Sequence, residues 1–288
     1  MSQKAIIAAR EVAASTATFH ADFVHSYSPK NLTTPPQVRP WYHGKYSTFF
    51  EGIGQVVSQT QVTKLCGKII QWGRGDDAKR LCQRRLDEHM GVSETQRRGE
   101  DSSLASARSI LSLGCNGQWS FERLAFQNTP CRVHTFDCTG TWPVPEVLRS
   151  RVTIHRVCLG TPSMVTRNPS RFANYTGLLQ MTGRRAPAFM KVDIEGFEYN
   201  LLSEMLQSAH DGSELPGQLG VELHRGLKAA KFKSKDPTNA GFARLVGELR
   251  RHYELMDRRQ NGRNGKAIEV LLVKKDPLGQ IMKQFSSK

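Results

Sequence analysis

A string of acidic residues behind an apolar run holds the side chains best suited to chemistry. Residues 189–198 have the sequence Phe-Met-Lys-Val-Asp-Ile-Glu-Gly-Phe-Glu, and the apolar run ends at Asp193. Alternation along an extended chain places Glu195 on the same side as Asp193. Two such carboxylates could stabilise a bound cation, orient a second substrate, or accept its proton as a general base. We therefore predict that Asp193 and Glu195 are catalytic.

A second polar pair ends the apolar string 220–224, Gly-Val-Glu-Leu-His. Alternation puts Glu222 and His224 on one face, and neighbouring strands of a sheet would bring them near Asp193 and Glu195. Histidine is well suited to accept a proton near neutral pH, so Glu222 and His224 are also predicted to be catalytic. The four side chains could form a metal site, but no spacing rule supports one, and we predict no metal.

Glycines follow another apolar run, in residues 110–117, Ile-Leu-Ser-Leu-Gly-Cys-Asn-Gly. Glycine lets the backbone approach a ligand closely, and ligands of open parallel sheets lie beyond the carboxyl ends of the strands. The spacing does not satisfy the dinucleotide pattern G-x-G-x-x-G, which weakens a dehydrogenase interpretation. The predicted cofactor-binding residues of this turn are Gly114, Cys115, Asn116 and Gly117.

An acidic residue, Asp137, ends the next apolar run, about 20 residues after the glycines, where a carboxylate is expected to accept two ribose hydroxyls. Further candidates for cofactor contact are Phe121, at the start of the helix that follows the glycines, and Leu159. Asp193 is expected to contact the cofactor as well as to take part in the reaction.

Short apolar runs alternate with longer segments from Arg108 onward. This pattern predicts a mainly parallel sheet with helices on both faces. The predicted strands are Ser109–Leu113, Cys131–Phe136, Val152–Val157, Ala188–Val192, Gln218–Leu223, Tyr253–Arg258 and Ala267–Val273. The predicted helices are Ser120–Gln127, Tyr199–Ala209 and Ala240–His252. A turn cluster at 261–265 predicts that the last two strands form an antiparallel hairpin. Seven strands ending in such a hairpin are typical of methyltransferases, whereas a plain dehydrogenase sheet lacks the hairpin.

Residues 1–105 differ in pattern from residues 106–288, and we expect an N-terminal extension followed by the catalytic domain. Within the extension we predict a helix at 5–19, an irregular stretch at 29–50 and a charged helix at 76–90. The polar run 93–106 has the composition of a linker or exposed loop.

Four strings in this order and spacing resemble the FkbM-type methyltransferases and related eukaryotic methyltransferase-like proteins: LSLGCNGQWSFE, VHTFDCT, MKVDIEGFEYNLL and QLGVELH. The likeness covers roughly residues 73–275. It implies a Rossmann-like class I α/β fold, S-adenosylmethionine as cofactor and O-methylation of a hydroxyl. Residues 70–82 resemble a Gly/Asp-rich segment that precedes the domain in the eukaryotic relatives, although Asp77-Ala78 stands where the family tends to have Gly-Gly.

The predicted function is therefore methyl transfer from S-adenosylmethionine, with an oxygen as the expected acceptor atom. Two alternatives stay open: an NAD-dependent oxidoreductase, and a methyltransferase-like binding module without activity. A small-molecule or glycan-like acceptor is favoured over a protein. The net charge of +15 permits a nucleic-acid partner, but no aromatic-interleaved RNA motif accompanies it.

The six cysteines show no metal-binding spacing, and we expect them to be reduced and structural. No apolar run reaches the roughly 20 residues of a membrane-spanning helix. The N-terminal region lacks the uninterrupted apolar core of a signal peptide, because Arg10 and Glu11 break it. A cytoplasmic location is expected.

Overall fold

The computed structural model describes residues 30–31, 50–90, 109–183, 185–209, 212–225, 237–261 and 266–275. The predicted helix at 5–19, most of the irregular stretch at 29–50 and the linker at 93–106 lie outside these residues. Among the described residues, no helix combines the length and apolarity needed to cross a bilayer.

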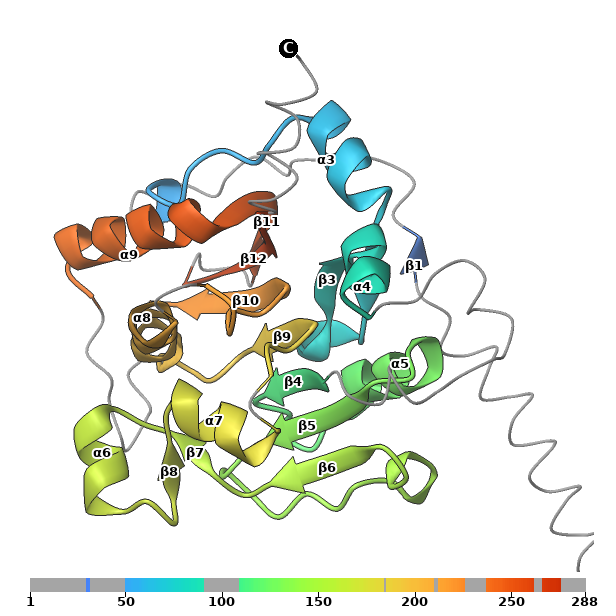
Figure 1. Cartoon of the computed structure of the whole chain (residues 1–288), viewed down its shortest axis with the longest axis vertical. Coiled ribbons are helices and arrows are strands. Elements are labelled where there is room, and N and C mark those ends of the chain that lie inside the picture. The colour runs from blue at the N-terminus through green and yellow to red at the C-terminus, as the bar shows by residue number, and fades with distance from the viewer. Residues whose placement is uncertain are drawn as a thin grey trace, which may run out of the picture.

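A seven-stranded sheet forms the centre of the molecule, with the order β11-β12-β10-β9-β4-β5-β6 (Figure 1). Its strands are β4 (Ser109–Leu113), β5 (Arg132–Phe136), β6 (Val152–His155), β9 (Phe189–Val192), β10 (Gln218–His224), β11 (Tyr253–Asn261) and β12 (Ala267–Lys274). The strand pairs from β6 to β10 are parallel, whereas β12 runs antiparallel to both β10 and β11. The predicted sheet and its terminal hairpin are confirmed.

This strand order is that of the class I methyltransferase fold: a doubly wound nucleotide-binding sheet with one antiparallel strand, β12, inserted near its end. From β4 the chain winds outward through β5 to β6, and it then returns to the other side of β4 to add β9 and β10. The direction of winding therefore reverses between β4 and β9. Ligands of open α/β sheets bind at such a switch point, beyond the carboxyl ends of the strands.

Each face of the sheet buries its own hydrophobic core. Figure 1 shows the helices that cover the two faces. Helices α7 (Tyr175–Met181), α8 (Glu198–Ser208) and α9 (Asn239–His252) cover one face. The other face is covered by α5 (Ser120–Asn128) together with α3 (Gln59–Cys66), α4 (Gln83–Met90) and the hairpin of β2 (Ile69–Trp72) and β3 (Lys79–Cys82). The short strand β1 (Lys30–Asn31) pairs with β2. After β6 in the chain, β7 (Cys158–Leu159) pairs with β8 (Phe172–Ala173), and the segment that connects these two strands contains α6 (Pro162–Arg167).

The charged helix predicted at 76–90 is wrong in its first half. A single 3-10 turn, η1 (Gly75–Asp77), leads into strand β3, and only α4 is helical. Gly73 and Gly75 adopt positive φ angles of 87° and 57°, which glycine reaches without strain. They let the chain reverse so that β3 pairs antiparallel with β2. This pairing outweighs the local helical pattern.

Two disulfides correct the expectation that all cysteines are reduced. Cys66 is bonded to Cys82, and Cys138 is bonded to Cys158, with Cα–Cα separations of 4.7 and 5.0 Å. Both separations lie in the usual range for disulfides. Cys115 and Cys131 are buried and belong to neither disulfide. The pairing depends on which loops the fold brings together, and sequence spacing carries no such information.

Candidate active site

A cavity of about 450 Å³ opens at the carboxyl ends of β4, β5 and β9, at the switch point of the sheet. Its size is typical of small-molecule sites. Seven residues predicted from sequence line it together: Gly114, Cys115, Asn116, Asp137, Leu159, Asp193 and Glu195. The strand-end argument therefore placed these residues in one cleft.

The glycine turn allows the backbone of β4 to pass directly against the segment after β9. Gly114 has a φ of 79°, and a Cβ atom there would overlap the carbonyl oxygen of Asp193. Its amide donates to the carbonyl of Phe136 at 2.9 Å, which ties the turn to β5. Only glycine fits this position, so the close approach that forms the cavity floor depends on it.

Asp137 holds the glycine turn through its carboxylate. Oδ2 accepts from the amides of Cys115 and Asn116 at 3.0 and 2.7 Å, and Oδ1 accepts from the amide and hydroxyl of Thr139 at 2.8 and 2.6 Å. Burial alone would raise the pKa of Asp137, but these four hydrogen bonds keep it below its ordinary value. Asp137 is thus ionised, and the Thr139 hydroxyl is the one partner that could rotate away to admit a ligand hydroxyl.

Two predicted cofactor residues do not line the cavity. A Cβ atom at Gly117 would lie 2.8 Å from Cε3 of Trp142, so the indole ring packs over this glycine. Phe121 is fully buried, with its ring centroid 5.9 Å from that of Trp72 and 5.7 Å from that of Phe189. Both residues pack around the turn and do not face the cavity.

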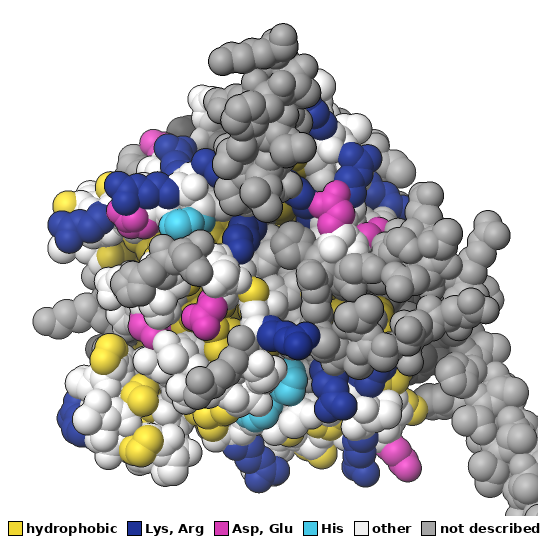
Figure 2. Space-filling model, in the orientation of Figure 1, with side chains coloured by type: hydrophobic (Ala, Val, Ile, Leu, Met, Phe, Trp, Pro, Cys, Tyr) yellow, Lys and Arg dark blue, Asp and Glu magenta, His cyan; other side chains and the backbone are white. Residues whose placement is uncertain are grey.

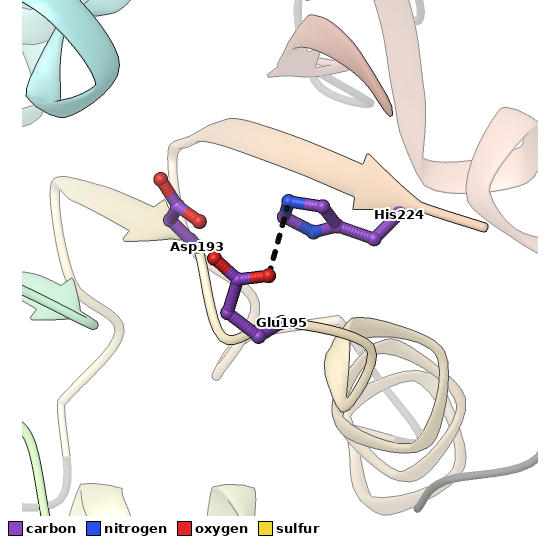
Figure 3. A group of neighbouring side chains, drawn as sticks. All are labelled: Asp193, Glu195 and His224. Atoms are coloured by element: carbon purple, nitrogen blue, oxygen red, sulfur yellow. Dashed lines mark ion pairs between the residues drawn. The ribbon is translucent and has the colours of Figure 1, made fainter. Parts of the chain in front are cut away.

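The four predicted catalytic residues meet at the cavity edge, and Figure 3 shows three of them, Asp193, Glu195 and His224. Nε2 of His224 lies 3.7 Å from Oε2 of Glu195 and 3.4 Å from Oε1 of Glu222. Glu195 has a φ of 52° and an exposed side chain that reaches back toward His224. Asp193, Glu195 and His224 offer ligand atoms that all lie within 4.8 Å of one another, so these three could hold a metal ion.

The environment of His224 favours its charged form. Nδ1 donates to Oε1 of the fully buried Glu198 at 2.6 Å. Burial lowers the pKa of His224, but the hydrogen bonds and charges of Glu198 and Glu222 outweigh it and raise the pKa to about 11. His224 therefore carries its proton at neutral pH. This leaves it suited to hold its neighbours in place, and unsuited to the role of proton acceptor predicted from sequence.

Asp193 is better placed to accept a proton. Burial raises its pKa to about 6, with the charge of Lys79 opposing the rise and that of Glu222 adding to it. The carboxylate is thus ionised at neutral pH but close enough to that range to exchange a proton. Asp193 also lines the cavity, which Glu222 and His224 do not.

Sequence reasoning assigned no role to two buried ionic residues that also line the cavity, Asp77 and Lys191. Lys191 donates to Oδ1 of Asp77 at 2.6 Å and to the carbonyl of Gly114 at 2.7 Å. Oδ2 of Asp77 accepts from Ser120 Oγ at 2.6 Å and from the amide of Phe121 at 2.8 Å. Asp77 thereby caps the N-terminus of α5 from another part of the chain. Two signals in the sequence pointed to them: the lysine inside the apolar run of β9, and the Gly/Asp-rich segment 70–82 that holds Asp77.

No protein-family model matches the chain, and no curated protein matches it. Among solved structures, a METTL16 methyltransferase domain is similar over 66% of this chain and 65% of that chain, with 10% identity and a TM-score of 0.36. The chain thus spans slightly less than two thirds of that domain. A human methyltransferase 10 domain-containing protein is similar over 67% of this chain and 83% of that one, at 10% identity and a TM-score of 0.35. The m1A22 tRNA methyltransferase TrmK of B. subtilis matches over 67% and 65%, at 12% identity and a TM-score of 0.32.

At these identities and scores the similarities carry no argument about function. The assignment to the class I methyltransferase fold rests on the strand order and on the cavity at the switch point. The narrower resemblance to FkbM-type enzymes stays an expectation from the sequence.

Proposed function

We propose that this chain is a methyltransferase that binds S-adenosylmethionine in the cavity at the switch point. The observation that carries the proposal is the composition of that cavity. Apolar side chains and carboxylates line the same cleft: Phe136, Val157, Leu159 and Phe172 are apolar, and Asp137, Asp193 and Glu195 are acidic.

The cavity lining fits the chemistry of this cofactor. The apolar side chains can pack against an adenine ring, and the ionised Asp137 can accept a ribose hydroxyl in place of the Thr139 hydroxyl. Asp193 and Glu195 would hold the sulfonium and the amino group of this cofactor through their carboxylates. When bound, S-adenosylmethionine supplies a methyl group that a nucleophile can displace in line.

The residues of this chain would then position the acceptor and manage its proton. Asp193, ionised at neutral pH, accepts the proton of an acceptor hydroxyl as the oxygen attacks. Glu195 orients the acceptor from the exposed rim, and the His224 imidazolium, fixed by Glu198, holds Glu195 and Glu222. Alignment of two reactants alone can lower a barrier by roughly 7–11 kcal/mol in favourable cases.

For the acceptor we propose a neutral hydroxyl compound, such as a small molecule or a glycan. Carboxylates beside the reacting centre would repel a phosphate-rich acceptor. On the face shown in Figure 2, the Lys and Arg side chains of the described residues are spread over several elements instead of forming one stripe. Among the described residues on this face, the positive side chains therefore form no single nucleic-acid-binding surface.

Calorimetric titration with S-adenosylmethionine tests the proposal, with NAD as the rival ligand. We expect binding of S-adenosylmethionine alone, weakened about 10- to 100-fold in Asp137→Asn because a charged hydrogen-bond acceptor is lost. Glu248→Gln, an exposed change on α9, is the matched control and should bind normally. Binding of NAD, or equal affinity in Asp137→Asn, would overturn the assignment.

Incubation with methyl-labelled cofactor and fractionated cell extract then addresses the acceptor. Label in the small-molecule or glycan fraction is expected, and label in RNA would refute the proposed acceptor class. Cofactor binding without label in any fraction would instead indicate a binding module.

A further inference from the structure

Lys79 enters the acidic site from outside the central sheet. It belongs to β3, its side chain is fully buried, and Nζ contacts three carboxylates: Glu269 Oε1 at 2.8 Å, Asp193 Oδ2 at 3.2 Å and Glu222 Oε2 at 3.5 Å. These acids come from β12, from the end of β9 and from β10, which are neighbours in the sheet. One ammonium group therefore bridges three adjacent strands.

The fold leaves room for this lysine at a glycine. A Cβ atom on Gly220 of β10 would lie 2.7 Å from Cζ of Phe189 and 3.3 Å from Cβ of Lys79. A side chain at this position would therefore press on both residues. The absence of one lets β3 pack directly on β10 and directs Lys79 toward the carboxylates.

The ionic contacts continue from Lys79 to the cavity edge. Glu222 contacts Lys79 through Oε2 and His224 through Oε1, and Asp193 gives Oδ2 to Lys79. Five carboxylates gather here, at residues 193, 195, 198, 222 and 269, beside the two cations Lys79 and His224. Buried carboxylates crowded in this way take up protons unless a cation stays among them.

The electrostatics of the individual groups agree with this balance. Burial disfavours the charge on Lys79, but the three carboxylates keep its pKa above the ordinary value. Burial raises the pKa of Asp193 and of Glu269, and in both cases the charge of Lys79 is the main opposing effect.

We propose that Lys79 is a positioning residue of the active site: its buried ammonium group ties Asp193 to Glu222 and Glu269 and fixes Oδ2 of Asp193, so that the other oxygen of Asp193 serves the reaction. The β2–β3 hairpin is then part of the catalytic centre. This inference rests on the proposed function only for the role of Asp193 in methyl transfer. The ionisation of Asp193 itself can be measured without cofactor.

The simpler explanation is that Lys79 only neutralises Glu269, its nearest partner. The double variant Lys79→Met/Glu269→Gln separates the two explanations, because it removes the cation together with the charge that it would neutralise. Glu269→Gln is the matched control, and Lys79→Arg keeps the positive charge.

Carbon-13 NMR of labelled aspartate carboxyls measures the pKa of Asp193, and the signal of Asp193 is identified by its absence in Asp193→Asn. Thermal unfolding shows whether each variant remains folded. We expect Lys79→Met/Glu269→Gln to unfold near the temperature of Glu269→Gln, but with the pKa of Asp193 higher by about one unit or more. In Lys79→Arg the pKa of Asp193 should lie within about half a unit of its wild-type value.

The proposal would be overturned if the pKa of Asp193 were the same in the double variant as in Glu269→Gln. It would also be overturned if the single variant Lys79→Met kept the wild-type pKa of Asp193. The failure of S-adenosylmethionine to bind the wild type would refute the proposed function and leave this measurement intact. If the cofactor binds, its affinity should fall in the double variant relative to Glu269→Gln, more steeply at pH 6 than at pH 8.

Discussion

Asp77→Asn perturbs a buried ion pair while leaving the shape of the side chain nearly unchanged. Asp77 is 4% exposed and joins Lys191 of β9 to the first turn of α5. Asparagine is also a good helix cap, so its amide oxygen can still accept from the amide of Phe121. The variant therefore tests mainly the loss of the carboxylate charge that balances the Lys191 ammonium group.

The expected cost follows from what Lys191 retains. After Asp77→Asn its ammonium group keeps the carbonyl of Gly114, and within the described part of the chain no other carboxylate lies at bonding distance of this group, although the charge of Glu122 acts on it. Removal of one partner of a buried ion pair costs about 3–5 kcal/mol. Lys191→Met should cost less, because Asp77 keeps its donors at the helix terminus. In the double variant no charge is stranded, so its cost should fall below the sum of the single costs by about 2–3 kcal/mol.

Urea unfolding of the wild type, the two single variants and the double variant measures these costs, provided that the slope of the transition stays constant. Glu248→Gln on the exposed side of α9 serves as a control and should change stability by less than about 0.5 kcal/mol. Additivity of the two single variants within about 0.5 kcal/mol would refute the argument that Asp77 and Lys191 form one stabilising unit.

Three further predictions concern the turn, the disulfides and pH. Gly114→Ala should lower stability severely and abolish cofactor binding, because the new methyl group overlaps the backbone of Asp193; a soluble variant with wild-type affinity in calorimetry would contradict this. Cys138→Ser/Cys158→Ser should lower the free energy of unfolding by about 3 kcal/mol in thermal unfolding, and it should weaken cofactor binding because a 20-residue loop opens in the cavity wall. Cys66→Ser/Cys82→Ser should lower stability by a similar amount but bind the cofactor normally. His224 binds its proton more tightly when folded, so its contribution is complete below about pH 6.5 and is lost as pH rises toward 11. Urea unfolding between pH 7 and 10 should show a fall of at most about 1.4 kcal/mol per pH unit in the wild type, and a shallower fall in Glu198→Gln; equal slopes would exclude His224 as the cause.

The parallel sheet could be predicted from sequence because its strands are short apolar runs buried on both faces. All five residues of β4 are buried, and β10 is buried throughout. The residues that end such strands must share one edge of the sheet. For this reason Gly114, Asp137 and Asp193 could be assigned to one cleft before the fold was known.

The β2–β3 hairpin and the buried charges on and beside it could not be predicted in the same way. The pairing of β3 with β2 competes with a local helical pattern, and only contacts distant in sequence decide the outcome. Lys79 meets Glu269 across 190 positions, and Asp77 meets Lys191 across 114. Composition gives only the net charge of +15, whereas the structure shows that these two lysines are buried and paired.

The two disulfides set conditions for making and handling the protein. Cys66–Cys82 fastens α3 to the hairpin, and Cys138–Cys158 joins the loop after β5 to β7. Such bonds form and persist in secreted, lumenal or periplasmic proteins and are rare in reducing cytosol. A chain produced in a reducing bacterial host would lack both links, so export or oxidative refolding is the appropriate route to native material.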